Sequence, residues 1–154
     1  MTPLSLSHIS GTSRQTDIAA LFDVDNTLLP GQASEVRFFR FLWKRGLVGW
    51  RELRDSVGWV LRNAPPVSLH PLRERKLYLA GKAAAEVESL AEEFCRAELF
   101  PRLSAQGLAR MDEHRRAGHH IVLVTGSLDF LIAPLATLLE VPTLLAAKLE
   151  RQQR

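Results

Sequence analysis

The feature that most constrains the fold is a short apolar run that ends in two carboxylates. Residues Ile18–Phe22 have the length and unbroken hydrophobicity of a β-strand that is covered on both faces. Asp23 and Asp25 follow at its carboxyl end, where parallel α/β sheets bind their ligands. Because side chains alternate along an extended chain, both carboxylates point the same way and Val24 points into the protein. Two acids aimed at one place repel unless a cation or a shared proton lies between them, so the pattern indicates a metal-assisted nucleophile beside an acid/base.

A second apolar strand, Ile121–Thr125, also ends in groups that suit an anion. Gly126 allows the backbone to turn tightly after the Thr125 hydroxyl, and Ser127 can cap a following helix. Free backbone N–H groups at the start of such a helix bind anions. We therefore expect Thr125, Gly126 and Ser127 to contact a phosphate, although this turn is common and by itself is only weak evidence for a site.

The two strand ends together resemble motifs one and two of the haloacid dehalogenase superfamily, in its phosphoserine phosphatase-like branch. The resemblance rests on Asp-x-Asp-x-Thr after one strand, a helical stretch, and a hydroxyl at the end of the next strand. It implies that Asp23 attacks phosphorus and forms an aspartyl phosphate, that Asp25 exchanges protons with the leaving group and water, and that Thr27 braces the loop. It also implies that Thr125 contacts the phosphate, and that Mg²⁺ binds at Asp23 and at the carbonyl of Asp25. The alternative is a solvated loop with two unremarkable acids.

This resemblance and the order of elements predict an α/β fold: an incomplete Rossmann-like parallel sheet of about three strands. Residues 18–30 and 100–154 would form the core, and residues 31–99 a helical cap inserted after the first strand. A separate helical domain with no part in the chemistry is the other interpretation of residues 31–99. Residues 1–17 are rich in Ser and Thr and are expected to form a disordered leader.

Apolar periodicity and capping residues predict the helices. The first is expected over Glu35–Arg45, with Ser34 as its N-cap and Gly46 at its end. The remaining elements are expected from about Trp50, from Pro71 to Ala80, around Val87–Phe94, from Ser104 to Arg116, over Leu128–Leu139, and as a strand over Thr143–Ala147.

Composition narrows the class of protein further. The single cysteine, Cys95, excludes an internal disulfide and suits a reducing compartment, so we expect a cytoplasmic protein with a buried, non-catalytic thiol. The net charge of +3 is mild and no nucleic-acid motif accompanies it, so no nucleic-acid partner is expected. Polar residues and prolines interrupt the apolar stretch Leu128–Ala147, which argues against a membrane span. The histidines His114, His119 and His120 are expected at the surface or at a strand edge rather than on a metal, because His119 and His120, as neighbours on a strand, point to opposite faces.

The resemblance has limits. In the family, motif three supplies a lysine and motif four supplies acids that complete the magnesium sphere, yet this chain ends at Arg154, and Lys148 comes too early to be that lysine. Without the strand that carries motif four, the first strand becomes an open hydrophobic edge, which favours self-association. We therefore expect the amino-terminal part of a longer phosphatase-like protein, or a natural truncation that needs a partner strand.

The function predicted from these residues is a magnesium-dependent phosphatase that hydrolyses a small phosphate monoester. The alternatives are a catalytically impaired fragment, a module of the same fold that binds phosphate or a partner, and transfer of the phosphoryl group to an acceptor other than water. Phosphoserine phosphatases hold the substrate amine with an acid nine positions after the nucleophile, and Gln32 stands there, with Glu35 nearby. Phosphoserine is therefore a doubtful substrate.

Overall fold

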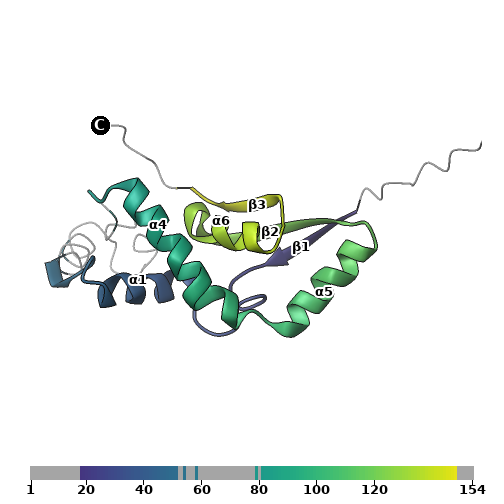
Figure 1. The fold of residues 1–154 in the computed structure, drawn as a ribbon, viewed down its shortest axis with the longest axis horizontal. Helices are drawn as coiled ribbons and strands as arrows, with labels where there is room; N and C mark the ends of the chain where they lie inside the picture. The colour runs from purple at the N-terminus through teal and green to yellow at the C-terminus, as the bar shows by residue number, and fades with distance from the viewer. Residues whose placement is uncertain (1–17, 52–53, 55–57, 59–78, 80, 149–154) are drawn as a thin grey trace, which may run out of the picture.

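Three parallel strands form an open sheet in the computed structural model, which describes residues 18–51, 54, 58, 79 and 81–148 (Figure 1). The strands are β1 (Ala19–Asp23), β2 (His120–Leu128) and β3 (Thr143–Ala147), in the spatial order β1-β2-β3. Parallel neighbours require crossover connections, and helices supply them here. The predicted α/β fold with an incomplete parallel sheet is confirmed.

The helices agree with the sequence periodicity wherever the structure describes them. Their bounds are α1 (Ser34–Lys44), α4 (Ala84–Phe94), the π-helical turn η2 (Cys95–Leu99), the 3₁₀ turn η3 (Phe100–Arg102), α5 (Ala105–Arg116) and α6 (Asp129–Leu138). The helix expected from about Trp50, the helix expected over Pro71–Ala80, and the leader 1–17 lie mostly or wholly outside the described residues. None of the described helices combines the length and the apolar character that crossing a membrane requires.

A side-chain cap is present at the start of α5 but not at the starts of α1, α4 and α6. The Oγ of Ser104 accepts the Gly107 N–H at 3.1 Å and caps α5, as expected. Gly46, with φ of 71°, follows the C-cap of α1. The expectation that Ser34 is the N-cap of α1 was wrong: Ala33 occupies that position, and Ser34 is the first helical residue, with its side chain turned to the site described below.

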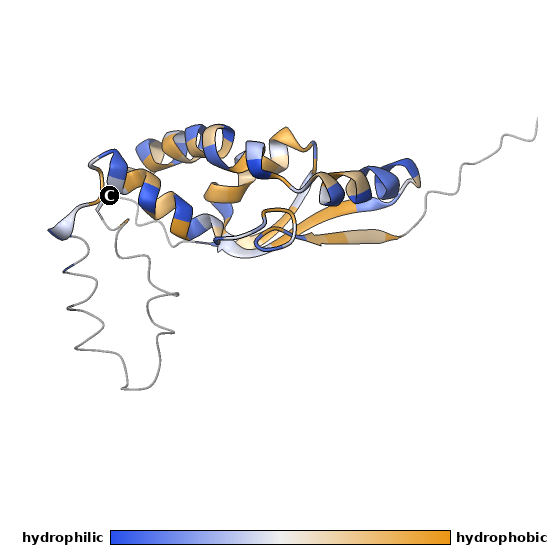
Figure 2. Ribbon diagram, turned by 90° about the horizontal axis from the view of Figure 1, so that it is seen from below, coloured by the Kyte–Doolittle hydropathy of each residue, from blue (hydrophilic) through white to orange (hydrophobic). Residues whose placement is uncertain are grey.

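Only one face of the sheet is covered by described helices. In β1, Ala20 and Phe22 are buried, whereas Leu21 is 64% exposed and the preceding Ile18 is 51% exposed. The expectation of a strand covered on both faces was therefore wrong for this chain. The physical reason is that the described helices lie on one side of the strands, as Figure 2 shows, and the ring of Phe22 contacts that of His114 in α5 on this side.

The opposite face is apolar and open among the described residues. Leu21 pairs with Val122 of β2, and Val124 pairs with Leu145 of β3, so these side chains share that face. Leu145 is 55% exposed. In the described sheet β1 has a neighbour on one side only, which agrees with the hydrophobic edge expected from the sequence.

An aromatic cluster joins α1 to the helices that pack beside it. The ring of Phe38 in α1 lies 5.2 Å from that of Phe94 in α4 and 6.1 Å from that of Phe130 in α6. Phe38 and Phe94 are fully buried, and Cys95 lies buried directly after α4, as expected. The start of α1 is thereby fixed relative to α6, which directly follows β2.

Candidate functional site

A tight loop presents the two acids at the carboxyl end of β1. The Leu28 N–H donates to the Asp23 carbonyl at 3.3 Å, and the Leu29 N–H donates to the Val24 carbonyl at 2.8 Å. Asn26 closes the turn with its N–H on the Leu29 carbonyl at 2.9 Å and adopts a φ of 66°, a backbone conformation that asparagine tolerates better than most residues. Val24, Leu28 and Leu29 are buried, so the loop is anchored on the core.

Asp23 is exposed at the start of this loop. Its Oδ2 accepts the hydroxyl of Thr27 at 3.0 Å. This contact fixes the orientation of the carboxylate and occupies one of its two oxygens. A carboxylate that is exposed and oriented is suited to meet a ligand from solvent.

A bulge in β2 forms the opposite wall. Val124 pairs with Leu145, but the next pair is Leu128 with Ala147, so three residues of β2 lie opposite one residue of β3. Such a bulge turns side chains out of the regular alternation. The residues displaced by it are 125–127, the same three that the sequence predicted for phosphate binding.

Within the bulge, Thr125 and Ser127 are buried, with 8% and 4% of their surface exposed, and Gly126 is exposed. The Ser127 N–H donates to the Thr125 Oγ1 at 3.0 Å, so this amide is already engaged. The expectation that Ser127 caps the next helix was wrong. The strand continues through the bulge, and Leu128 is the N-cap of α6, without a side-chain cap.

Asp25 lies in a network of hydrogen bonds with two buried serines. Its Oδ1 accepts the Ser34 N–H at 2.7 Å. Its Oδ2 accepts the Ser34 hydroxyl at 3.2 Å and the Ser127 hydroxyl at 2.7 Å. The two hydroxyl oxygens lie 2.9 Å apart. The loop after β1, the start of α1 and the bulge of β2 thus meet at one carboxylate.

The register of the sheet explains why these groups meet. Asp23 pairs with Val124, so the acidic loop and the bulge leave the sheet side by side at its carboxyl edge. Of the residues predicted from sequence, Asp25 and Ser127 are in direct contact, and Ser127 contacts Thr125. Sequence reasoning missed the contact of Ser34 with Asp25. The signal was present, because the first N–H groups of a helix have no partner within the helix and attract carboxylates.

The available donors fit a hard cation. Asp23 and Asp25 offer oxygen only, which Mg²⁺ prefers, and the exposed position of Asp23 leaves room for the water molecules that Mg²⁺ retains. The carboxylate of Asp25 is occupied by serine donors, so its backbone carbonyl is the ligand to consider beside the Asp23 carboxylate. No cluster of three or more His, Cys, Asp or Glu suited to a metal occurs among the described residues.

The histidines lie elsewhere. His114, near the end of α5, and His119 are half-buried with their Nδ1 atoms 2.8 Å apart, whereas His120 is exposed. The His119 N–H also donates to the His114 carbonyl at 3.0 Å, which is the bond that closes the helix end before β2. The pair therefore belongs to a helix terminus rather than to the acidic loop.

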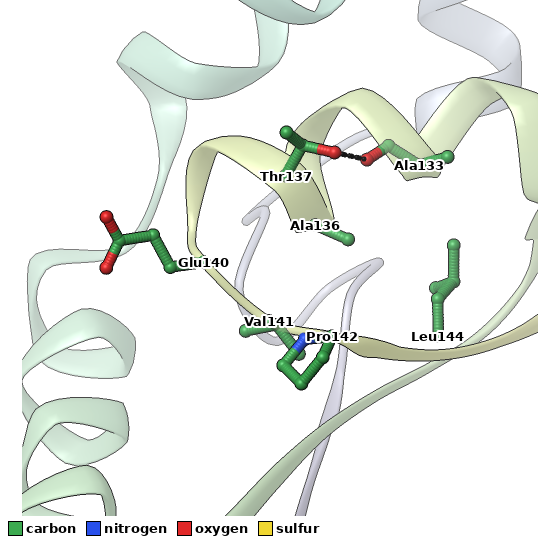
Figure 3. Close-up of a pocket in the computed structure, with 7 residues that line it drawn as sticks. All are labelled: Ala133, Ala136, Thr137, Glu140, Val141, Pro142 and Leu144. Atoms are coloured by element: carbon green, nitrogen blue, oxygen red, sulfur yellow. Dashed lines mark hydrogen bonds between the residues drawn. The ribbon is translucent and has the colours of Figure 1, made fainter.

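The structure also has a cavity of about 580 Å³ between α6 and β3 (Figure 3). Its lining is largely apolar and includes Ala133, Pro142 and Leu144. Thr137 bonds back to the Ala133 carbonyl at 3.1 Å, and the Glu140 carboxylate points away from the other labelled side chains. No residue of the acidic loop or of the bulge lines it. We therefore place the candidate site at the carboxyl edge of the sheet.

Comparison with known proteins gives the class to which this fold and site belong. Residues 20–154 match the family model of the haloacid dehalogenase-like hydrolases, and the chain belongs to that family. A histidinol-phosphatase of Neisseria meningitidis is 28% identical over 134 residues, which are 85% of this chain and 60% of the relative.

Solved structures agree on the fold. A protein of unknown function from Bordetella pertussis Tohama I superposes with a TM-score of 0.71 at 29% identity, over 90% of this chain and 64% of that one. A phosphoserine phosphohydrolase-like protein from Francisella tularensis gives a TM-score of 0.55 at 18% identity, over 90% of this chain and 61% of that one, and shows a similar fold. The chain thus spans less than two thirds of the length of these relatives.

Proposed function

We propose that this chain carries the site of a magnesium-dependent phosphatase that hydrolyses a small phosphate monoester through an aspartyl phosphate on Asp23. The observation that carries the proposal is the different setting of two acids that lie two positions apart. Asp23 is exposed and is oriented by Thr27, whereas three donor groups hold the carboxylate of Asp25. Membership of the haloacid dehalogenase-like hydrolases and similarity to a histidinol-phosphatase support phosphoryl chemistry.

The two acids have different roles in this proposal. The Thr27 hydroxyl holds Oδ2 of Asp23 in place, and Oδ1, which meets no donor among the described residues, is in our proposal the oxygen that attacks phosphorus. The bond from phosphorus to the leaving oxygen breaks as the bond to Asp23 forms, and Asp25 gives its proton to the leaving oxygen. Water then attacks the acyl phosphate and passes a proton to Asp25, which releases inorganic phosphate and restores Asp23.

The phosphate is held from the other strand. In our proposal the phosphate contacts the Thr125 hydroxyl and the backbone of the exposed Gly126. The Ser127 N–H keeps its hydrogen bond to the Thr125 Oγ1. When magnesium is bound, at the Asp23 carboxylate and the Asp25 carbonyl, it offsets the repulsion between phosphate and carboxylate.

Residues 31–99 act as a cap over this site in the same proposal. The first residue of α1, Ser34, donates its N–H to the Asp25 carboxylate, so this helix starts at the site. A helical insertion in this position can exclude water while the phosphoryl group is transferred. The buried, unpaired Cys95 supports a reducing compartment, so we place the protein in the cytoplasm.

The test is hydrolysis of 4-nitrophenyl phosphate with and without Mg²⁺, for the wild type and Asp23→Asn. Asparagine has nearly the same shape but is a far poorer nucleophile, so we expect at least about 1,000-fold loss of kcat. Asp112→Asn, which changes an exposed acid on α5, is the matched control and should keep full activity. Activity that survives Asp23→Asn would contradict the nucleophile. A folded but inactive wild type would favour a module that binds phosphate without turnover.

A further inference from the structure

We propose that Ser34 and Ser127 are positioning residues that hold the Asp25 carboxylate so that Oδ1 alone carries the proton exchanged with the leaving group. The inference rests on the acid/base role of Asp25 proposed above. It assigns a function to two buried hydroxyls and names the atom that transfers the proton.

The assignment of Oδ1 follows from counting acceptor positions. Each carboxylate oxygen has two lone pairs. Both approaches to Oδ2 are occupied by buried hydroxyl oxygens, that of Ser127 at 2.7 Å and that of Ser34 at 3.2 Å, whichever way the Ser34 hydrogen points. Among the described residues, Oδ1 accepts a single hydrogen bond, from the Ser34 N–H at 2.7 Å. One lone pair of Oδ1 is therefore left for a proton that can move to the substrate.

The two hydroxyls support one another. Their oxygens lie 2.9 Å apart, so Ser34 can donate either to Ser127 or to Asp25, while Ser127 donates to Asp25. Loss of either hydroxyl breaks this triangle. Of this triangle, the remaining serine then keeps Asp25 alone as a partner, and Oδ2 is left with one hydroxyl instead of the two that fixed its direction.

Burial makes these bonds difficult to replace by water. Ser34 is completely buried and Ser127 is 4% exposed. Asp25 itself is half-buried, and the two hydroxyls approach it from its buried side, where water does not readily replace a lost donor. In Ser34→Ala or Ser127→Ala we therefore expect the Asp25 carboxylate to rotate about its backbone anchor at Oδ1, so that Oδ2 moves and the free lone pair of Oδ1 changes direction.

The start of α1 adds a directional constraint. The Ser34 N–H belongs to the first turn of an 11-residue helix, where backbone donors have no partner within the helix and the dipole is positive. This donor remains in both serine-to-alanine variants. The variants thus remove the hydroxyls and leave the backbone anchor unchanged.

The experiment compares two phosphate esters that differ in their need for an acid. An alkyl phosphate such as glycerol phosphate has a poor leaving group that requires a proton, whereas 2,4-dinitrophenyl phosphate leaves as a stable anion. We expect Ser34→Ala and Ser127→Ala to lower kcat/KM for the alkyl ester by about 10- to 100-fold and for the dinitrophenyl ester by less than about 3-fold. A general loss of structure would lower both values alike.

Two further variants make the result specific. Asp25→Ala should show the same preference for the activated ester, with a larger loss on the alkyl ester. Ser104→Ala removes another serine hydroxyl that accepts a hydrogen bond, at the start of α5, and should not distinguish the two esters. If Asp25→Ala is selective and the serine variants are not, this inference fails and the proposed function stands. If Asp25→Ala is not selective, the acid/base role itself fails.

A measurement without turnover completes the test. Crystal structures of the wild type and of the double variant Ser34→Ala/Ser127→Ala should show the Asp25 carboxylate in different orientations. A carboxylate that keeps its wild-type orientation without both hydroxyls would overturn the inference, whatever the catalytic activity of the chain.

Discussion

The Ser127 hydroxyl lies 2.7 Å from the Oδ2 of Asp25, although 102 positions in the sequence separate the two residues. The contact requires that β1 and β2 pair in their observed register, with Asp23 beside Val124, and that the bulge follows at residues 125–127. The acidic loop and the hydroxyl-bearing bulge are therefore one structural unit, although each comes from a different strand.

The cap of α5 gives a direct test of local stability. Ser104→Ala removes the side chain that accepts the Gly107 N–H, so we expect the free energy of unfolding to fall by about 1 kcal/mol, measured by urea denaturation. Ser89→Ala, at an exposed position inside α4, is the matched control and should change it by less than about 0.5 kcal/mol. Equal effects of the two substitutions would contradict the assigned cap.

The buried thiol of Cys95 gives a prediction for alkaline pH. Burial raises the pKa of this thiol from its ordinary value of 9.0 to about 11. The neutral form is thus favoured in the folded state, and its contribution to stability is present below pH 9 and is lost as the pH rises towards 11. We expect the difference in unfolding free energy between the wild type and Cys95→Ala to shift by up to about 3 kcal/mol over that range.

The comparison with Cys95→Ala isolates this thiol, because other groups that titrate in the same range are common to both proteins. Parallel stability curves of the two proteins between pH 8 and 11 would contradict the burial of Cys95. A thiol reagent gives a second readout: at pH 8 it should modify the cysteine only after the protein unfolds.

The open face of the sheet predicts self-association. Leu21 and Leu145 are 64% and 55% exposed on a face that no described helix covers, beside the hydrophobic edge of β1. We expect the molar mass from light scattering to rise with protein concentration. Leu21→Lys places a charge on the apolar face, so the same rise should need a protein concentration at least about 10-fold higher.

Val36→Lys is the control for this prediction, because Val36 is 47% exposed and belongs to α1 rather than to the sheet. It should associate like the wild type. A wild type that stays monomeric at all concentrations, or equal effects of the two lysines, would contradict an interface on the sheet.

Much of the fold could be predicted because it depends on local signals. The strand Thr143–Ala147 has the predicted bounds, and α5 starts after Ser104 as its capping pattern requires. The acids at the end of β1 were also predictable, since an apolar run that stops at Asp23 places them at the edge of the sheet. These features need no knowledge of distant contacts.

The remaining features depend on tertiary contacts that a single segment does not contain. Apolar side chains on both faces of β1 predicted burial of both, but burial also needs a covering element, and Leu21 has none among the described residues. The Thr-Gly-Ser sequence permitted a turn, yet pairing with β3 continues to Leu128 through a bulge. Serine is a common N-cap residue, so Ser34 was predicted to cap α1. Its observed contact with Asp25 depends on how α1 is placed against the acidic loop.

Phosphorylation of Asp23 during turnover can be detected directly by chemical trapping. The wild type is mixed with a phosphate ester and Mg²⁺, quenched with borohydride, which reduces an acyl phosphate to an alcohol, and digested for mass spectrometry. Phosphorylation of Asp23 predicts homoserine at residue 23, and no such product in a parallel sample of Asp23→Asn. Release of phosphate by the wild type with residue 23 still an unmodified aspartate, or with the reduced residue at another position, would contradict it.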